Sequence, residues 1–101
     1  MRRLNLTGQN IAKQRTDRGW TQQMLIAKLQ IKGVDITRDV LANAESGRSK
    51  VPEDLLIGCQ VVFRVRLVML FPKAVQEFEK EIVKREEEQK IRDAAARQRR
   101  P

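Results

Sequence analysis

The sequence predicts an all-α fold. Apolar residues recur at spacings of three and four along most of the chain, which is the period of a helix with one buried face. Residues that favour helix ends, such as Thr21, Thr37 and Gly47, stand where these patterns start or stop. Residues 65–71 are rich in β-branched side chains, but no second strand is evident to pair with them, so we expect a short turn of helix that closes the core.

The first helix is expected to follow Thr7, which can cap it, and to end before Gly19, which can adopt the left-handed conformation. Ile11 and Ala12 would form its apolar patch. Trp20 comes next as a lone aromatic residue, and we interpret it as an aromatic plug in the core rather than a platform for stacking bases.

The second helix is expected to begin after Thr21, a good N-cap residue, and to end around residues 31–33. The residues expected on its buried face are Met24, Leu25, Ala27 and Leu29. The link that follows is longer than a tight turn, so the next helix starts several residues later.

The third helix can be capped by either Thr37 or Asp35. Leu41 and Ala44 are expected to pack into the core, and residues 46–47 end the helix.

A fourth helix is expected to begin near Pro52, because proline suits the first helical position and the acidic Glu53 and Asp54 suit the positive end of the helix dipole. The apolar stripe expected along this helix consists of Leu56, Cys59, Val62 and Phe63.

The organisation expected is one compact domain over residues 1–71 followed by a charged helical tail over residues 72–101. In the tail, Val75, Phe78 and Ile82 recur at helical spacing, but little else there can be buried. The tail is therefore a strong helix former with weak packing.

Ion pairs along the tail can support its helix. Glu81 with Arg85 and Glu86 with Lys90 have the required i, i+4 spacing, and each such pair is worth about 0.2–0.5 kcal/mol. Residues 97–101 are expected to fray.

The chain is strongly basic, with 21 Lys and Arg against 13 Asp and Glu and a net charge of +8. Residues 73–101 hold nine basic and seven acidic residues, so +6 of that charge falls on residues 1–72. A surplus of this size on a small domain favours a polyanionic partner such as nucleic acid.

A membrane is the competing polyanion, and the sequence argues against it. The longest apolar stretch, residues 55–71, is interrupted by Arg64 and Arg66, so it is a poor transmembrane span. No secretory signal is visible after the first residues, which makes the cytoplasm the expected location.

Catalytic chemistry is not expected. The chain has no histidine and a single cysteine, Cys59, which we interpret as a small buried hydrophobe. No carboxylate pair, nucleophile with a base, metal-binding cluster or glycine-rich phosphate loop appears, so we expect neither an enzyme nor a cofactor or metal site.

Residues 21–25 and 37–48 have the character of two short helices joined by a turn. The second carries polar side chains on the face that does not pack, which in a basic chain is typical of a helix that lies in the major groove of DNA. We interpret the pair as a helix-turn-helix.

Around this helix-turn-helix, the order of residues over roughly positions 5–71 resembles the pattern of the lambda-repressor-like, or Xre, helix-turn-helix family. The residues that carry the resemblance are Ile11, Arg15, Gly19, Thr21, Gln22, Leu25, Leu29, Leu41, Glu45, Ser46, Gly47, Arg48, Leu70 and Phe71. The family implies a compact five-helix domain that binds operator DNA, usually as a dimer.

The resemblance also implies roles for individual residues. Base contacts would come from Thr37, Arg38, Asp39 and Asn43 on the N-terminal part of the recognition helix. Phosphate contacts would come from Thr21, Gln22, Ser46, Arg48 and Lys50. Arg15 and Glu45 would form a structural ion pair between the first and third helices.

The chemistry of the side chains suits these roles. Arg38 can bind guanine O6 and N7 in a bidentate manner, Asn43 can pair with adenine, and Asp39 can accept from cytosine N4 or simply orient Arg38.

The leading hypothesis is therefore sequence-specific binding of double-stranded DNA by a dimeric transcriptional repressor of a bacterium or phage. The alternative is an antitoxin-like or protein-interaction module whose residues 73–101 bind a partner protein. A tail that pairs with its own copy is a third option.

Overall fold

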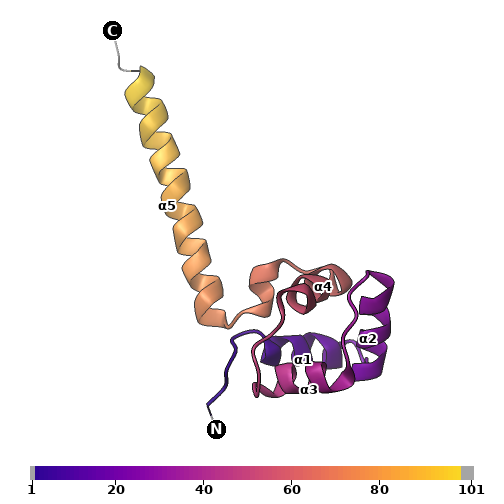
Figure 1. The fold of residues 1–101 in the computed structure, drawn as a ribbon. Helices are drawn as coiled ribbons and strands as arrows, with labels where there is room; N and C mark the ends of the chain where they lie inside the picture. Colours follow the sequence, from indigo (N-terminus) through magenta and orange to yellow (C-terminus); the bar gives the residue numbers. More distant parts are fainter. Residues whose placement is uncertain (1, 99–101) are drawn as a thin grey trace.

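A computed structural model describes residues 2–98 and confirms the all-α fold, since it contains only helices within that range. The elements are α1 (Gly8–Asp17), α2 (Gln22–Ile31), α3 (Arg38–Ser46), α4 (Glu53–Phe63), the short 3₁₀ helix η1 (Leu67–Leu70) and α5 (Lys73–Gln98). Helices α1 to α4 gather into one body, and α5 extends away from it (Figure 1).

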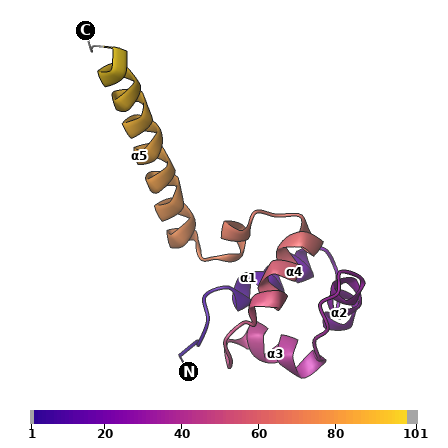
Figure 2. The same ribbon diagram turned by 45° about the horizontal axis from the view of Figure 1, so that its top comes forward.

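The core lies between α1, α2, α3 and α4, and η1 packs against α1 and α4 to close it. The turned view in Figure 2 shows these four helices gathered together. Its buried apolar residues are Ile11, Leu25, Ile26, Leu29, Leu41, Ala44, Leu55, Cys59, Phe63 and Leu70. None of these residues comes from α5, so the long helix contributes nothing to the fully buried core.

The N-caps of α2 and α3 form as predicted. The Oγ1 atom of Thr21 accepts from the backbone N–H of Met24 at 3.1 Å. In the same way the Oγ1 atom of Thr37, and not a side-chain atom of Asp35, accepts from the N–H of Val40 at 3.2 Å. Each bond satisfies an N–H that has no partner within its helix.

The cap expected for α1 was wrong. Thr7 precedes the helix but makes no capping hydrogen bond, because its backbone (φ −109°, ψ −22°) is already close to helical, whereas a capping side chain requires extended backbone. The N–H of Gly8 instead donates to Oδ1 of Asn5 at 2.7 Å. At the other ends, Gly19 adopts the left-handed conformation, as predicted, and Gly47, which ends α3 as expected, adopts the same conformation.

The buried face expected for α2 was partly wrong. Leu25 and Leu29 are buried as predicted, but Met24 is 44% exposed and Ala27 is exposed, while Ile26 is only 4% exposed. Because α2 packs against both α3 and α4, the buried arc turns toward residues 25, 26 and 29.

Helix α4 begins slightly later than predicted. Pro52 has ψ 143°, so it occupies the N-cap position and Glu53 is the first helical residue. The stretch of residues 65–71 forms the expected short turn as η1, and Leu70 on that turn is fully buried.

The apolar stripe of α4 is centred slightly differently from the prediction. Cys59 and Phe63 are buried as expected. Leu55 is also fully buried, whereas Leu56 and Val62 are only half-buried. The difference arises because Leu55, Cys59 and Phe63 follow an i, i+4, i+8 row along the side of the helix that faces the core.

Trp20 lies at the edge of the core. It is half-buried, and its ring stacks on that of Phe63 with a centroid distance of 5.8 Å. The Nζ atom of Lys28 lies 4.4 Å from the centroid of the Trp20 ring, a cation–π arrangement. Trp20 therefore packs as an aromatic residue of the core margin and not as a fully enclosed plug.

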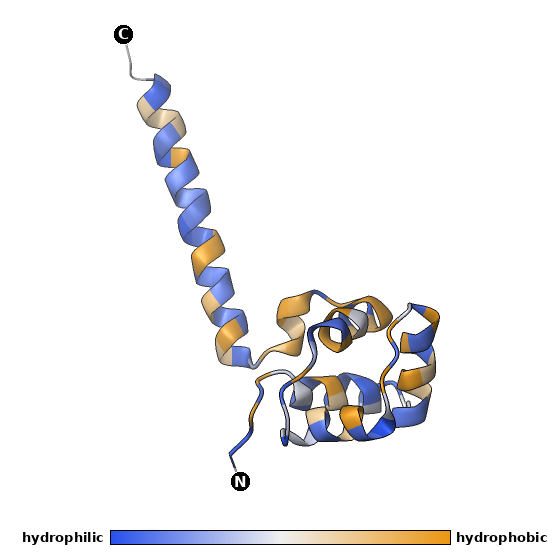
Figure 3. Ribbon diagram, viewed as in Figure 1, coloured by the Kyte–Doolittle hydropathy of each residue, from blue (hydrophilic) through white to orange (hydrophobic). Residues whose placement is uncertain are grey.

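Helix α5 makes the molecule elongated. Its main contact with the body is through η1, and the molecule measures 64 × 33 × 22 Å. The radius of gyration is 18.5 Å, compared with about 13 Å for a compact chain of similar length. Polar residues dominate the surface of α5 (Figure 3).

The ion pairs expected on α5 form in part. Glu81 and Arg85 approach to 3.5 Å, but within the described part of this helix Glu86 and Lys90 do not pair. The helix includes Arg97 and ends at Gln98, so of the expected frayed end only residues 99–101 lie outside the described residues. None of the helices described here is long and apolar enough to span a bilayer.

Candidate nucleic-acid interface

Helix α3 has two faces with separate roles. Leu41, Ala44 and Glu45 are buried against the other helices. Arg38, Asp39 and Asn43 are exposed. The side chains of these three exposed residues make no hydrogen bond or ion pair with any other residue in the described range 2–98, so their donors and acceptors remain available to a ligand.

The remaining residue expected to contact bases, Thr37, is also exposed at the start of α3. Its oxygen caps the helix, as described above, but its hydroxyl proton is not needed for that bond. Arg38 and Asp39 do not bond to each other, so the structure gives no sign that Asp39 orients Arg38.

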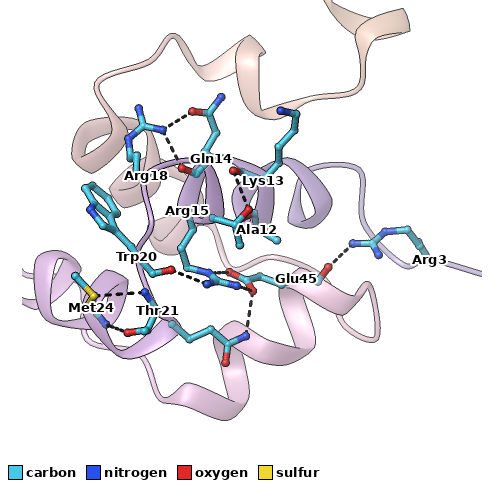
Figure 4. A network of polar contacts seen from close by, with 12 residues as sticks. Arg3, Ala12, Lys13, Gln14, Arg15, Arg18, Trp20, Thr21, Met24 and Glu45 are labelled. Carbon is cyan, nitrogen blue, oxygen red and sulfur yellow. Dashed lines mark hydrogen bonds and ion pairs between the residues drawn. The ribbon is translucent and has the colours of Figure 1, made fainter.

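Arg15 and Glu45 form the ion pair that the resemblance implied. The Nε and Nη2 atoms of Arg15 donate to the two carboxylate oxygens of Glu45, each at 2.8 Å (Figure 4). Both side chains are largely enclosed, with exposed fractions of 13% and 7%. The hydrogen bond to Glu45 raises the pKa of Arg15, so the guanidinium remains charged.

Further hydrogen bonds extend this ion pair to α2. The Nη1 atom of Arg15 donates to the carbonyl oxygen of Trp20 at 2.8 Å, and Nε2 of Gln22 donates to Glu45 at 3.0 Å. The network therefore joins α1, the start of α2 and the end of α3. Since the link between α2 and α3 covers residues 32–37, this network helps to fix the position of α3 where a tight turn is absent.

The residues expected to contact phosphate lie at two places. Thr21 is exposed at the start of α2, and Gln22 beside it is half-buried with its side-chain N–H directed to Glu45. Ser46, Arg48 and Lys50 are exposed at and after the end of α3. Gln22 can thus offer its backbone N–H to an anion at the helix N-terminus more readily than its side chain.

The N-terminal segment is hydrogen-bonded to the end of α3, a contact that no sequence pattern predicts. Nη2 of Arg3 donates to the carbonyl oxygen of Glu45 at 2.7 Å, and the N–H of Leu4 donates to the carbonyl oxygen of Gly47 at 2.8 Å. Nδ2 of Asn5 donates to the carbonyl oxygens of Ala44 at 2.9 Å and of residue 49 at 2.7 Å.

These contacts place Arg3 beside the cations that follow α3. The Arg3 side chain covers Gly47, because a Cβ at Gly47 would be 2.8 Å from its Cγ atom. Arg48 is the next residue in the chain. The only sequence signal for this arrangement was the basic start of the chain, which does not say where Arg3 packs.

The charge balance of this surface is positive. The two acidic residues of α3 are Asp39, which is exposed, and Glu45, whose charge is neutralised by Arg15. Exposed cations are present on Arg38, Arg48 and the neighbouring Lys50. A positive surface around an exposed polar helix attracts a polyanion at long range and can then read it at short range.

The described residues offer little for metal binding or thiol chemistry. Across residues 2–98, no group of three His, Cys, Asp or Glu side chains is arranged to hold a metal ion. Cys59 is buried and unpaired, and burial raises the pKa of its thiol to about 12. Comparison with protein-family models, with curated proteins and with solved structures finds no match to this chain.

Proposed function

We propose that this chain binds double-stranded DNA in a sequence-specific manner through a helix-turn-helix of the lambda-repressor-like type, with α3 as the recognition helix. The single observation that carries the proposal is the state of Arg38, Asp39 and Asn43. All three are exposed on one helix, and their side chains make no hydrogen bond or ion pair with the other described residues. Arg and Asn are the side chains that best read guanine and adenine in the major groove.

The roles follow from the positions of the groups. Arg38 and Asn43 read base edges, with Thr37 and Asp39 beside them. Arg48, Lys50, Ser46 and the start of α2 at Thr21 and Gln22 bind phosphates and set the register of the domain on the duplex.

The biological role that fits this activity best is that of a dimeric transcriptional repressor in the cytoplasm of a bacterium or of a phage host. A dimer would place two copies of α3 in successive major grooves and so bind an inverted repeat. Such an arrangement roughly doubles the contacts to bases and phosphates.

Selection of bound duplexes from a random DNA pool tests the proposal. The full chain is incubated with the pool in moderate salt with competitor DNA. We expect enrichment of an inverted repeat whose half-sites lie about 10 base pairs apart, one turn of the double helix.

The matched control is the double variant Arg38→Ala/Asn43→Ala. Both side chains are exposed and make no hydrogen bond with the other described residues, so the fold is expected to survive, and circular dichroism and thermal unfolding check that it does. This variant should lose the enriched sequence while still binding DNA weakly. No enrichment with the native chain, or the same enriched sequence with the variant, would refute the proposal.

A further inference from the structure

Helix α5 and η1 form an apolar groove that nothing in the described structure fills. The groove has a volume of about 290 Å³. Its apolar lining consists of Leu67, Val68, Phe71, Val75, Phe78 and Ile82. Phe78 is 63% exposed although it belongs to this lining, and Ile82 is 38% exposed. Exposed aromatic and aliphatic side chains that converge on a groove are typical of a surface that binds another protein.

The charges beside this groove are ordered along the helix. When Val75 and Ile82 are assigned to a positions and Phe78 to the d position of a heptad, the e and g positions from residue 79 to residue 93 can be read directly. They are occupied by Glu79, Glu81, Glu86, Glu88 and Asp93. Every one of these flanking positions is acidic.

Among the basic residues of the first half of α5, Arg85 occupies a d position on the stripe and pairs with Glu81 at 3.5 Å, whereas the other three lie elsewhere. Lys73, Lys80 and Lys84 fall on the side of the helix opposite the apolar stripe, since each residue advances by about 100°. Arg66 pairs with Glu79 at the mouth of the groove. Glu81, Glu86 and Glu88 are exposed to solvent. A ligand along the stripe would therefore meet carboxylates on both sides.

This pattern disfavours a second copy of α5 as the occupant. In a parallel pair, Glu81 would face Glu86 of the other copy, and Glu88 would face Asp93. In an antiparallel pair, acidic g positions would face g and acidic e positions would face e. The a and d positions beyond Ile82 carry Arg85, Gln89 and Arg92, which cannot extend an apolar seam.

We propose that the groove between η1 and α5 binds an amphipathic helix of another protein whose apolar stripe is flanked by Lys or Arg. Apolar side chains of that helix enter the groove around Phe78, and its basic side chains lie opposite Glu81, Glu86 and Glu88. The helix-in-groove mode matches the shape, and opposite charges at flanking positions select the partner. This inference does not depend on DNA binding by α3.

Two designed peptides of three heptads test the charge pattern. Both carry leucine at a and d, and one has lysine at every e and g position while the other has glutamate there. Fluorescence anisotropy measures their binding to the full chain at low salt. We expect the lysine peptide to bind at least about tenfold more tightly, a difference that falls as salt rises.

Variants of the full chain locate the site. Phe78→Ala should weaken binding of the lysine peptide about tenfold, because it removes the aromatic anchor from the groove. The matched control is Ile91→Ala, which truncates a 70% exposed apolar residue of α5 outside the groove and should leave binding unchanged. The triple variant Glu81→Lys/Glu86→Lys/Glu88→Lys should reverse the preference toward the glutamate peptide.

Three results would overturn the inference. Equal affinity for the two peptides, or equal loss with Phe78→Ala and Ile91→Ala, would mean that the groove does not select a basic-flanked helix. Light scattering that shows a dimer of the free chain, dissociated by Phe78→Ala and not by Ile91→Ala, would mean that a second copy fills the groove instead. Whether Phe78→Ala still selects a DNA sequence tests the proposed function and not this inference, because α3 does not contribute to the groove.

Discussion

Gly8, at the start of α1, lies directly against the carbonyl oxygen of Ala44 in α3. The approach is so close that a Cβ atom on residue 8 would be only 1.9 Å from that oxygen. Asn5 connects the same two points, since its side chain accepts from the N–H of Gly8 and donates to the carbonyl oxygen of Ala44. Only glycine leaves room for this approach, so residue 8 sets how closely α1 and α3 can pack.

Replacing Gly8 with alanine should therefore destabilise the domain. The added methyl group forces the two helices apart, and overpacking of this kind costs about 1–3 kcal/mol or more. Urea unfolding followed by circular dichroism measures the change. Gln9→Ala, at an exposed position in the same turn, is the control and should change stability by less than about 0.5 kcal/mol. A Gly8→Ala variant as stable as the native chain would contradict the close contact.

Removal of the Glu45 carboxylate should cost far more than removal of an exposed one. Glu45→Ala leaves the enclosed guanidinium of Arg15 without its partner, and breaking a buried pair in this way costs about 3–5 kcal/mol. The control is Asp17→Ala, which breaks the exposed Lys13–Asp17 pair and should cost about 0.5 kcal/mol or less. Thermal and urea unfolding of both variants give the comparison, and similar losses would show that the Arg15–Glu45 pair adds nothing to the fold.

Cys59 should make stability depend on pH in the alkaline range. Burial, with the charge of Glu45 as a second cause, raises the pKa of this thiol from 9.0 to about 12. The stabilisation is complete below pH 9, where the thiol is protonated in both states, and it is lost as the pH rises toward 12, because only the unfolded chain then ionises.

The native chain should consequently lose stability between pH 9 and about pH 11 more steeply than Cys59→Ala, by up to about 1.4 kcal/mol per pH unit. Urea unfolding at several pH values measures both slopes. Below pH 9, Cys59→Ala is less stable than the native chain because of the cavity that it leaves, so the slopes and not the absolute stabilities are compared. Parallel slopes would be evidence against the raised pKa.

Substitutions at the two ends of α3 should separate base contacts from phosphate contacts. Arg38→Ala should weaken binding to the selected duplex by about 1–3 kcal/mol, with little change for random DNA. Arg48→Ala should weaken binding to both duplexes alike and reduce the salt dependence by about one ion. Titrations on both duplexes at several salt concentrations give these values. Equal losses for Arg38→Ala on the two duplexes would remove its assignment as a base reader.

Features that depend on neighbouring residues could be predicted well from the sequence. The caps at Thr21 and Thr37, the left-handed Gly19 and the short turn of η1 all follow from residues within one helical turn of each other. The burial of Ile26 in place of Met24 could not be predicted in this way, because it depends on the two helices that cover α2.

Contacts between distant parts of the chain were the least predictable. Asn5 and Arg3 bond to the end of α3 across about forty positions, and no periodic pattern marks them. The Arg15–Glu45 pair was expected only because of the family resemblance. The groove beside α5 also requires η1 and α5 to meet, which the apolar spacing of Val75, Phe78 and Ile82 alone does not specify.

The buried side chains and the exposed side chains of α3 belong to different residues, so the exposed surface can mutate separately from the core. Leu41, Ala44 and Glu45 are buried, whereas the side chains of Arg38, Asp39 and Asn43 are exposed and make no hydrogen bond or ion pair with the other described residues. Mutations at the outer positions are therefore free of the folding constraint. A lineage, or a library in the laboratory, can change this outer surface one residue at a time without first acquiring compensating changes in the core.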